Sequence, residues 1–372
     1  MPKSMKNKNL LIFSYDFPPS NGGIARLCNE IAYGALSEYD DVIVLTIKKD
    51  GPQTPYNNQK LQIKYLPSAR IFSEIAAWWF LLTLKNKKNY HTLCGIWHPE
   101  AFLVWLAGYN KINVLAHGAE LLAGNSMFRK QFWLKIYAKW ILSKVTIIAN
   151  SDFTASLCKN IAPKAKISAL PLAVNHHFFK QLENKAINKI VFGTVSRIVQ
   201  FKGHDFILKV LSKLPKKHIT QIEWHIAGTG PYLEELKQDV IKFKLESVVK
   251  FHGFIPDNEL PNFYNSLNVF ILCTRQTSDS NDVEGFGLVF LEAQACGLPV
   301  IGTNTGGISS AIKQNNGGWL IEQDSELELS EMLKNVIDDA LILKEQGLKA
   351  RKRIEEECTW ELYCQKLFKI LD

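Results

Sequence analysis

Two glutamates that lie eight positions apart, Glu284 and Glu292, are the clearest sign of chemistry in this chain of 372 residues. They belong to the stretch 281–307, in which Gly285-Phe286-Gly287 precedes an apolar run that ends at Cys296. A helix over 287–296 is therefore predicted to be buried, and a carboxylate in its middle is costly unless something satisfies it. At about 1.5 Å per helical residue the two carboxylates lie roughly 10–12 Å apart, about the span from the ribose to the sugar of a nucleotide-sugar.

Two cations follow a strand that is predicted at 189–195. Arg197 comes at the strand end, and Lys202 precedes Gly203 one short loop later. Such cations, with the free backbone N–H groups of a helix start, can hold a diphosphate whose charge grows as a bond to it breaks. Each feature alone has a simpler interpretation, a surface Arg and Lys or a structural buried glutamate. Together they favour a site for a phosphorylated sugar.

The elements that must position these residues alternate between strand-like and helix-like runs, which predicts an α/β fold with parallel sheets. In the first half, strands are expected at 10–15, 42–47, 62–66, 92–97, 113–116, 145–149 and 166–170, and helices at 25–37, 71–84, 99–109, 128–143 and 152–160. In the second half, strands are expected at 189–195, 223–227, 248–251, 269–273 and 300–302. The polar segment 175–188 is the predicted linker, and an amphipathic helix is expected over 343–371.

Open parallel sheets bind ligands at the carboxyl ends of their strands, so residues at those ends are the other candidates. In the first half these are Gly22, Gly23, His98, His117 and Asn150. In the second half they are Gly228, Gly253, Phe254, Phe286, Gly287, Leu288 and the loop 304–307. The run Gly228-Thr229-Gly230-Pro231 lacks the third glycine of a dinucleotide fingerprint, which counts against NAD.

Composition narrows the class of protein. The content of 47% hydrophobic and 22% charged residues is ordinary for a globular chain, and the longest apolar run, 75–84, is too short to span a bilayer. The seven scattered cysteines form no C-x-x-C, which indicates reduced thiols in a cytoplasmic protein and no zinc. No export signal is evident at the start of the chain.

Charge is concentrated in the first half of the chain. Residues 1–180 hold 22 Lys and Arg against 10 Asp and Glu, a net charge of +12, whereas the remainder has −4. This predicts an anionic partner. The stretch 129–144 mixes aromatic residues with cations, a pattern of helices that lie on anionic membranes and also of helices that pack on a sheet; the packing interpretation is preferred.

The sequence EGFGLVFLE followed by ACGLPVIGTNTGG resembles the retaining glycosyltransferases of family 4, and the family's other motifs occur in order along essentially the whole chain. The resemblance implies the GT-B fold, two Rossmann-like domains that face each other across a deep cleft. The first, 1–174, would bind the acceptor and the second, 189–355, the nucleotide-sugar. The final helix, 356–372, would cross back to the first domain.

The resemblance also implies roles for individual residues. Glu284 would bind ring hydroxyls of the donor sugar, Glu292 the ribose hydroxyls, and Arg197 and Lys202 the leaving diphosphate. The implied catalytic set is Glu284, His117, Arg197 and Lys202. The implied donor-binding set is Gly22, Gly23, Arg197, Lys202, Gly228, Gly253, Phe254, Glu284, Phe286, Gly287, Leu288 and Glu292. His98 and Asn150 are weaker candidates for binding the acceptor.

No D-x-D occurs in the chain, so no metal and no cofactor are expected. Within the family, DFPPSNGGI with DVEGFG resembles mannosyltransferases that use GDP-mannose, including those that act on phosphatidylinositol mannosides. UDP-sugar donors stay open. The expected acceptor is a glycan or a lipid-linked molecule in the synthesis of cell-surface polysaccharide, lipopolysaccharide or glycolipid. The protein is expected in the cytoplasm, and the inner face of the cytoplasmic membrane is the alternative location.

Three rival functions are weighed. A GT-B-type sugar-nucleotide epimerase would share the fold. A glycosidase would use Glu284 and Glu292 as an acid and base pair, but two groups on one loop-helix unit flank a bond poorly, and Arg197 and Lys202 would have no task. A nucleic-acid binder would explain the basic half but not a buried Glu292, so no nucleic acid is expected.

Overall fold

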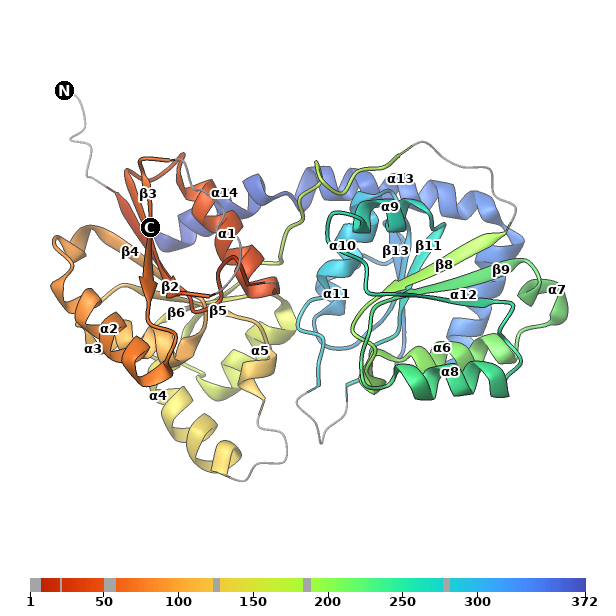
Figure 1. Cartoon of the computed structure of the whole chain (residues 1–372), viewed down its shortest axis with the longest axis horizontal. Helices are drawn as coiled ribbons and strands as arrows, with labels where there is room; N and C mark the ends of the chain where they lie inside the picture. Colours follow the sequence, from red (N-terminus) through yellow and green to blue (C-terminus); the bar gives the residue numbers. More distant parts are fainter. Residues whose placement is uncertain (1–7, 21, 50–57, 123–127, 183–188, 277–281) are drawn as a thin grey trace. The chain divides into compact units, whose positions relative to one another are not determined.

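The chain forms two compact units in the computed structural model, shown in Figure 1. The first unit is Met1–Leu170 with Trp360–Asp372, and the second is Pro171–Thr359. The structure describes residues 8–20, 22–49, 58–122, 128–182, 189–276 and 282–372. Residues 183–188 of the predicted linker and Asn281 of the glutamate-bearing stretch therefore lie outside the described residues.

The first unit is built on a seven-stranded parallel sheet in the order β3-β2-β1-β4-β5-β6-β7. Its central strands are buried on both faces, which explains why they read as continuous apolar runs in the sequence. The strands are β1 Asn9–Phe13, β2 Asp41–Ile47, β3 Leu61–Leu66, β4 Tyr90–Cys94, β5 Ile112–Ala116, β6 Thr146–Ala149 and β7 Lys166–Ala169.

Helices follow most of these strands, as the alternating pattern predicts. The longer ones are α1 Gly23–Ala35, α2 Arg70–Thr83, η4 Arg129–Ala138 running on into α4 Lys139–Leu142, and α5 Asp152–Ile161. The shorter ones are η1 Lys87–Asn89, η2 Trp97–Ala101, α3 Phe102–Leu106 and η3 Ala119–Leu121. The helix expected over 99–109 is thus shorter than predicted, because the chain is extended at His98 and α3 ends at Leu106.

The second unit has a six-stranded parallel sheet in the order β10-β9-β8-β11-β12-β13. The strands are β8 Ile190–Val195, β9 Ile222–Ala227, β10 Val249–Gly253, β11 Val269–Leu272, β12 Val300–Thr303 and β13 Gly318–Ile321. The helices are η5 Gln200–Lys202, α6 His204–Ser212, α7 Lys216–Ile219, α8 Leu233–Lys242, α9 Leu260–Asn265, α10 Leu288–Ala295, α11 Ile308–Ala311, α12 Glu326–Asp338 and α13 Ala340–Glu357.

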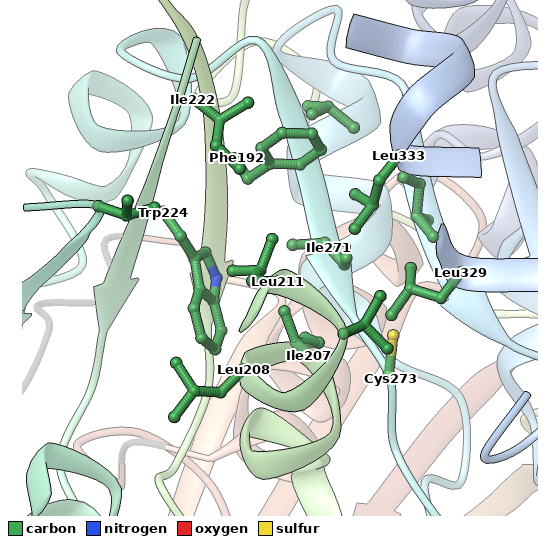
Figure 2. Close-up of a cluster of buried hydrophobic side chains, with 14 of the residues drawn as sticks. Phe192, Ile207, Leu208, Leu211, Ile222, Trp224, Ile271, Cys273, Leu329 and Leu333 are labelled. Carbon is green, nitrogen blue, oxygen red and sulfur yellow. The ribbon is translucent and has the colours of Figure 1, made fainter. Parts of the chain in front are cut away.

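One core cluster of the second unit lies between the sheet and the helices α6, α8 and α12. Figure 2 shows Phe192, Trp224 and Ile271 of the strands together with Leu211 and Leu333 of these helices. The buried Trp224 indole donates a hydrogen bond of 3.0 Å to the Thr194 hydroxyl, so its polar atom is satisfied. The core fixes the strands, and therefore the loops at their carboxyl ends.

The prediction of a single helix over 343–371 is wrong, because the structure has two helices there, α13 and α14 Trp360–Leu371. The backbone between them pairs with another segment: Val174 N donates to Cys358 O at 3.0 Å, and Val174 forms a parallel bridge with Thr359. Helix α14 then packs on α1 of the first unit. A Cβ at Gly34 of α1 would lie 2.5 Å from the Cys364 sulfur, so glycine permits this close contact.

No helix in the described part of the chain is both long and apolar enough to cross a membrane.

Candidate functional site

An ion pair between Lys202 and Glu284 is the centre of the candidate site in the second unit. The Lys202 Nζ and Glu284 Oε2 atoms are 2.5 Å apart, and the two side chains are 15% and 17% exposed. Lys202 ends η5 after strand β8, and Glu284 precedes helix α10. Two of the predicted catalytic residues, 82 positions apart in the sequence, are therefore in direct contact.

The loop that carries Lys202 is pressed against the end of β11. Gly203 has a φ of +74°, and a Cβ there would lie 1.8 Å from the Cys273 carbonyl oxygen. Arg275 N donates to Phe201 O at 2.7 Å, which ties the same loop to the residues after β11. Glycine is therefore required beside Lys202, and the lysine sits on a backbone that is held on both sides.

Arg197 lies at the carboxyl end of β8, as predicted, with an exposed side chain. Its loop contacts the end of β9, because a Cβ at Gly228 would lie 1.9 Å from the Ser196 carbonyl oxygen. Gly228 N in turn donates to Gly253 O at 2.7 Å, and the next residue, Phe254, is 72% exposed. The structure thus brings together the predicted residues at the ends of β8, β9 and β10. The side chains of Arg197 and Phe254 are both exposed to solvent there.

The start of helix α10 is fixed by a second glycine loop. Gly287 caps the helix at a φ of +89°, and Phe286 before it is buried. Gly307 N donates to Glu284 O at 2.8 Å, and a Cβ at Gly306 would lie 2.4 Å from that same oxygen. The loop 304–307, which the sequence suggests as a second ligand contact, therefore packs on the Glu284 backbone.

Glu292 is buried in the middle of α10, with 5% of its surface exposed. One carboxylate oxygen accepts a hydrogen bond of 2.8 Å from the hydroxyl of Tyr264 on α9, a fully buried side chain. The sequence does not reveal this partner, since Tyr264 reads as one more apolar residue of its helix. The bond explains how the protein tolerates the buried carboxylate, and ribose binding by Glu292 stays a prediction.

His117 and Asn150 lie together in the first unit, at the ends of β5 and β6. The His117 Nε2 atom is 2.8 Å from Gly95 O, and because a carbonyl only accepts, Nε2 carries the proton. The His117 backbone N donates to Glu120 Oε1 at 2.7 Å, and Asn150 Nδ2 donates to His117 O at 3.2 Å. The ring is held at one nitrogen, and Nδ1 is the nitrogen that is left for other contacts.

His98 belongs to a different setting, an aromatic cluster of the first unit. Its Nδ1 atom is 2.8 Å from the Tyr137 hydroxyl, and its ring centroid is 4.7 Å from that of Trp133. Burial lowers the pKa of His98. These contacts resemble those of a satisfied structural histidine, so its role in acceptor binding stays a prediction.

The glycines after β1 are exposed. Gly22 is extended, with a φ of −154°, and a Cβ there would meet nothing within 4 Å. Gly23 opens helix α1. The protein's own packing therefore does not require glycine at position 22, and close approach to a donor phosphate stays a prediction for this pair.

Sequence reasoning missed two sets of residues around the site. Glu100 is 1% exposed and accepts backbone hydrogen bonds beneath the ends of β1 and β4. Arg275 forms ion pairs of 2.7 Å with both Asp205 and Asp324 behind the Lys202 loop. An acid soon after an apolar strand was a usable signal for Glu100. No sequence signal joins Arg275 to two carboxylates 70 and 49 positions away.

No cluster of three or more His, Cys, Asp or Glu residues in the part of the chain that the structure describes could hold a metal ion. All seven cysteines are free and buried.

Known proteins resemble this chain over nearly its full length. Residues 175–357 match the family described as glycosyl transferases group 1. The chain is 23% identical to the GDP-mannose-dependent monoacylated alpha-(1-6)-phosphatidylinositol monomannoside mannosyltransferase of Corynebacterium glutamicum, over 98% of both chains. It is 25% identical to the GDP-mannose-dependent alpha-(1-6)-phosphatidylinositol monomannoside mannosyltransferase of Mycolicibacterium smegmatis, over 97% of this chain and 98% of that one.

The fold is shared with solved structures. HepE of Anabaena, in a complex with UDP and glucose, superposes with a TM-score of 0.76 at 17% identity and covers 98% of this chain and 99% of its own. The family match lies within the second unit, which holds Lys202, Glu284 and Glu292.

Proposed function

We propose that this chain, a glycosyltransferase of the GT-B fold whose residues 175–357 match the glycosyl transferases group 1 family, moves a hexose from a nucleotide-diphosphate sugar to an acceptor hydroxyl. The anomeric configuration is retained, and no metal takes part. The observation that carries this proposal is the contact of Lys202 with Glu284, because it joins the lysine proposed for the phosphate to the glutamate proposed for the sugar hydroxyls.

Bond breaking puts charge on the leaving diphosphate. Lys202 and the exposed Arg197 stabilise this charge, and preorganised cations at such a point lower the barrier more than they stabilise the ground state. The bond from the anomeric carbon to the diphosphate oxygen breaks. The acceptor oxygen bonds to that carbon on the same face, and its proton passes to the leaving phosphate.

Glu284 accepts hydrogen bonds from the donor sugar's ring hydroxyls, assisted by the backbone at Phe286, Gly287 and Leu288. Glu292 accepts from the ribose hydroxyls, next to its bond from Tyr264. His117, whose ring is held through Nε2, is proposed to offer Nδ1 to the donor sugar. Gly228, Gly253 and the exposed Phe254 lie by the base.

GDP-mannose is the proposed donor. The support is that two relatives named as GDP-mannose-dependent mannosyltransferases align with nearly all of this chain. UDP-sugars are the alternative, since HepE, which shares the fold, was solved with UDP and glucose. A lipid-linked or glycan acceptor is proposed for the first unit, as the same two relatives act on a phosphatidylinositol monomannoside.

The donor is tested by thermal unfolding with GDP, UDP, ADP and their sugars. A ligand that binds the folded state raises the unfolding temperature by mass action, so GDP and GDP-mannose are expected to give the largest shift. Product analysis follows, with the donor alone and with candidate acceptors. Slow hydrolysis of the donor alone agrees with a transferase, whereas an epimerised donor would contradict the proposal.

We further propose that the first unit docks on anionic membranes through two helices. Helix α2 exposes large apolar side chains along one side, Ile71, Phe72, Ile75 and Trp79, each more than half exposed. The stretch 128–142 exposes Phe128, Phe132, Ile136 and Trp140, four positions apart and so on one face. Exposed apolar stripes of this kind mark interaction surfaces.

Both helices pack on one core cluster of the first unit, α2 through Ala77 and Leu81 and the second helix through Leu134 and Ala138. Burial, together with the carboxylate of Glu74 on α2, raises the pKa of Tyr137 on η4 to about 12. The buried face of the second helix, Leu134, Ala138 and Ile141, packs on the core as the sequence interpretation prefers. The apolar side chains of its exposed face are available to a partner. The exposed Lys135, Lys139 and Lys144 favour a partner that carries negative charge.

Vesicle flotation tests the docking surface. At about 0.15 M salt, where attraction between charges is largely screened, the wild type is expected to float with vesicles that contain phosphatidylglycerol, and the double variant Phe72→Ser with Trp79→Ser is expected to lose most of this binding. Leu341→Ser is the matched control, because Leu341 is 77% exposed on α13 of the second unit. Equal flotation of the double variant and the wild type would refute the surface.

A further inference from the structure

Glu100 is a buried carboxyl group that the proposed transfer does not use. It is 1% exposed and lies in η2, after strand β4. A carboxyl group in such a position is expensive unless hydrogen bonds satisfy it. Its partners show what it does in the fold.

The two oxygens of Glu100 bind the backbone of two different loops. Oε1 accepts from Tyr15 N at 2.8 Å, and Oε2 accepts from Ile96 N at 2.7 Å. Tyr15 follows β1 and Ile96 follows β4, and these strands are neighbours in the sheet, with Phe13 opposite Cys94. One side chain therefore ties together two adjacent strand ends at the edge of the sheet where parallel sheets bind ligands.

Gly95 connects this tie to His117. Its N donates to Phe13 O at 2.8 Å, and its carbonyl oxygen is the partner of His117 Nε2, also at 2.8 Å. A Cβ at Gly95 would lie 2.4 Å from the Ser14 hydroxyl and 2.9 Å from Glu100 Oε2. Glu100 thus packs directly against the residue whose carbonyl orients the His117 ring.

We propose that Glu100 is a positioning residue, which holds the loops after β1 and β4 and, through the Gly95 carbonyl, sets the orientation of the His117 imidazole. The proposal rests on the proposed function for the catalytic use of His117, but the positioning itself does not. Glu100 also anchors the start of the loop that leads to Gly22 and Gly23, so both candidate contacts of the first unit share one support.

The surroundings keep this support uncharged near neutral pH. Burial raises the pKa of Glu100 to about 8, the bonds from Tyr15 N and Ile96 N act against that rise, and Asp16 adds to it. Cys28, Cys94 and Tyr15 are titratable neighbours as well, and burial also raises their pKa values. A neutral carboxyl group avoids a buried unpaired charge and still tethers both loops.

The test compares Glu100→Ala, Glu100→Gln, His117→Ala and the double variant Glu100→Ala with His117→Ala. The control is Glu38→Gln, an exposed residue of the same unit. One measurement is the NMR titration of imidazoles in protein with 15N-labelled histidine, where His117 is identified by its absence in His117→Ala. The other is kcat and the acceptor KM with the donor that thermal unfolding selects.

The alanine variant should shift the His117 titration and lower kcat about ten- to a hundredfold, as misplaced groups do. The glutamine variant keeps one acceptor oxygen and should have a smaller effect on both, and Glu38→Gln should have none. In the His117→Ala background, Glu100→Ala should cost kcat little more.

Two results would overturn the proposal: a His117 titration that is unchanged in both Glu100 variants, or effects on kcat that simply multiply in the double variant. If the alanine variant does not fold, the glutamine variant decides by the same titration. An absence of transfer in the wild type with every donor would instead refute the proposed function, and the His117 titration would still decide the positioning role.

Discussion

At the scale of single residues, the site of the second unit depends on charges that have mutual partners. Lys202 and Glu284 neutralise each other in a partly exposed position, so neither charge is stranded in the fold. Removal of one partner leaves the other charged and without its counterion. This loss destabilises the fold more when the pair is partly buried than when it lies on the surface. Besides this effect on stability, we expect the pair to matter for catalysis, because each member is proposed to contact the donor.

Lys202→Ala and Glu284→Ala are expected to lower kcat/KM by at least about a hundredfold, because each removes a group that is proposed to stabilise the transition state. Circular dichroism should show that both variants stay folded. Lys213→Ala is the control, since Lys213 pairs with Glu326 on the surface and should be silent. Wild-type rates in either site variant would remove that residue from the mechanism.

A second prediction at this scale concerns the stability of the chain against pH. Burial raises the pKa of Glu100 to about 8, above its ordinary value of 4.5. Between these two values the folded chain binds more protons than the unfolded chain, so the unfolding free energy falls as the pH rises. The slope for one group is at most about 1.4 kcal/mol per pH unit.

Glu100→Gln cannot titrate and should lack this slope. Denaturant unfolding from pH 5 to pH 9 measures the unfolding free energy of the wild type and of Glu100→Gln. The wild type should lose stability relative to the variant as the pH rises to about 8, and the difference between the two should then level off. A constant difference across this range would contradict the buried, protonated carboxyl group.

Residue types and spacing revealed part of the site and not the rest. Lys202 and Glu284 could be found because each stands in a local motif beside glycines. Tyr264 and Arg275 could not, since the contacts that make them important join positions far apart in the sequence. Glu292 shows the limit: its position was correctly read as buried, while the hydroxyl that satisfies it comes from another helix.

At the scale of elements, buried parallel strands were predictable because they are short continuous apolar runs. The helix over 343–371 was misread because its amphipathic pattern continues across the break at 358–359, where pairing with Val174 overrides it. The strand β13, Gly318–Ile321, has only four residues and starts with glycine, so it gave no periodic signal. Tertiary pairing decides such cases.

Loop geometry yields a prediction at this scale. Gly203→Ala would place a Cβ 1.8 Å from Cys273 O at a φ of +74°, so the Lys202 loop must shift and transfer should be lost. Gly108→Ala is a matched control, because its φ is +82° but nothing lies within 4 Å. The control should show only the backbone strain of about 1–2 kcal/mol on unfolding. Equal activity of the two variants would show that the loop tolerates the shift.

At the scale of the whole molecule, charge and function divide between the two units. The first half of the chain is basic and carries the exposed stripes of α2 and η4, while the acidic second half carries the family match and the residues proposed to bind the donor. A membrane partner would therefore meet the first unit through two separable forces, attraction between charges and burial of apolar side chains.

Salt separates these two forces. At about 0.1 M salt, charges that are more than about 10 Å apart hardly interact. Flotation of the wild type with phosphatidylglycerol vesicles should therefore weaken as salt rises and then reach a plateau. The binding that remains at the plateau is the contribution of the apolar side chains. The double variant Phe72→Ser with Trp79→Ser should lose the plateau but keep the binding at low salt. Vesicles of phosphatidylcholine alone give the plateau without the salt-dependent part. A wild type whose binding vanishes in salt would show that charge alone holds it, and the exposed stripes would then need another partner.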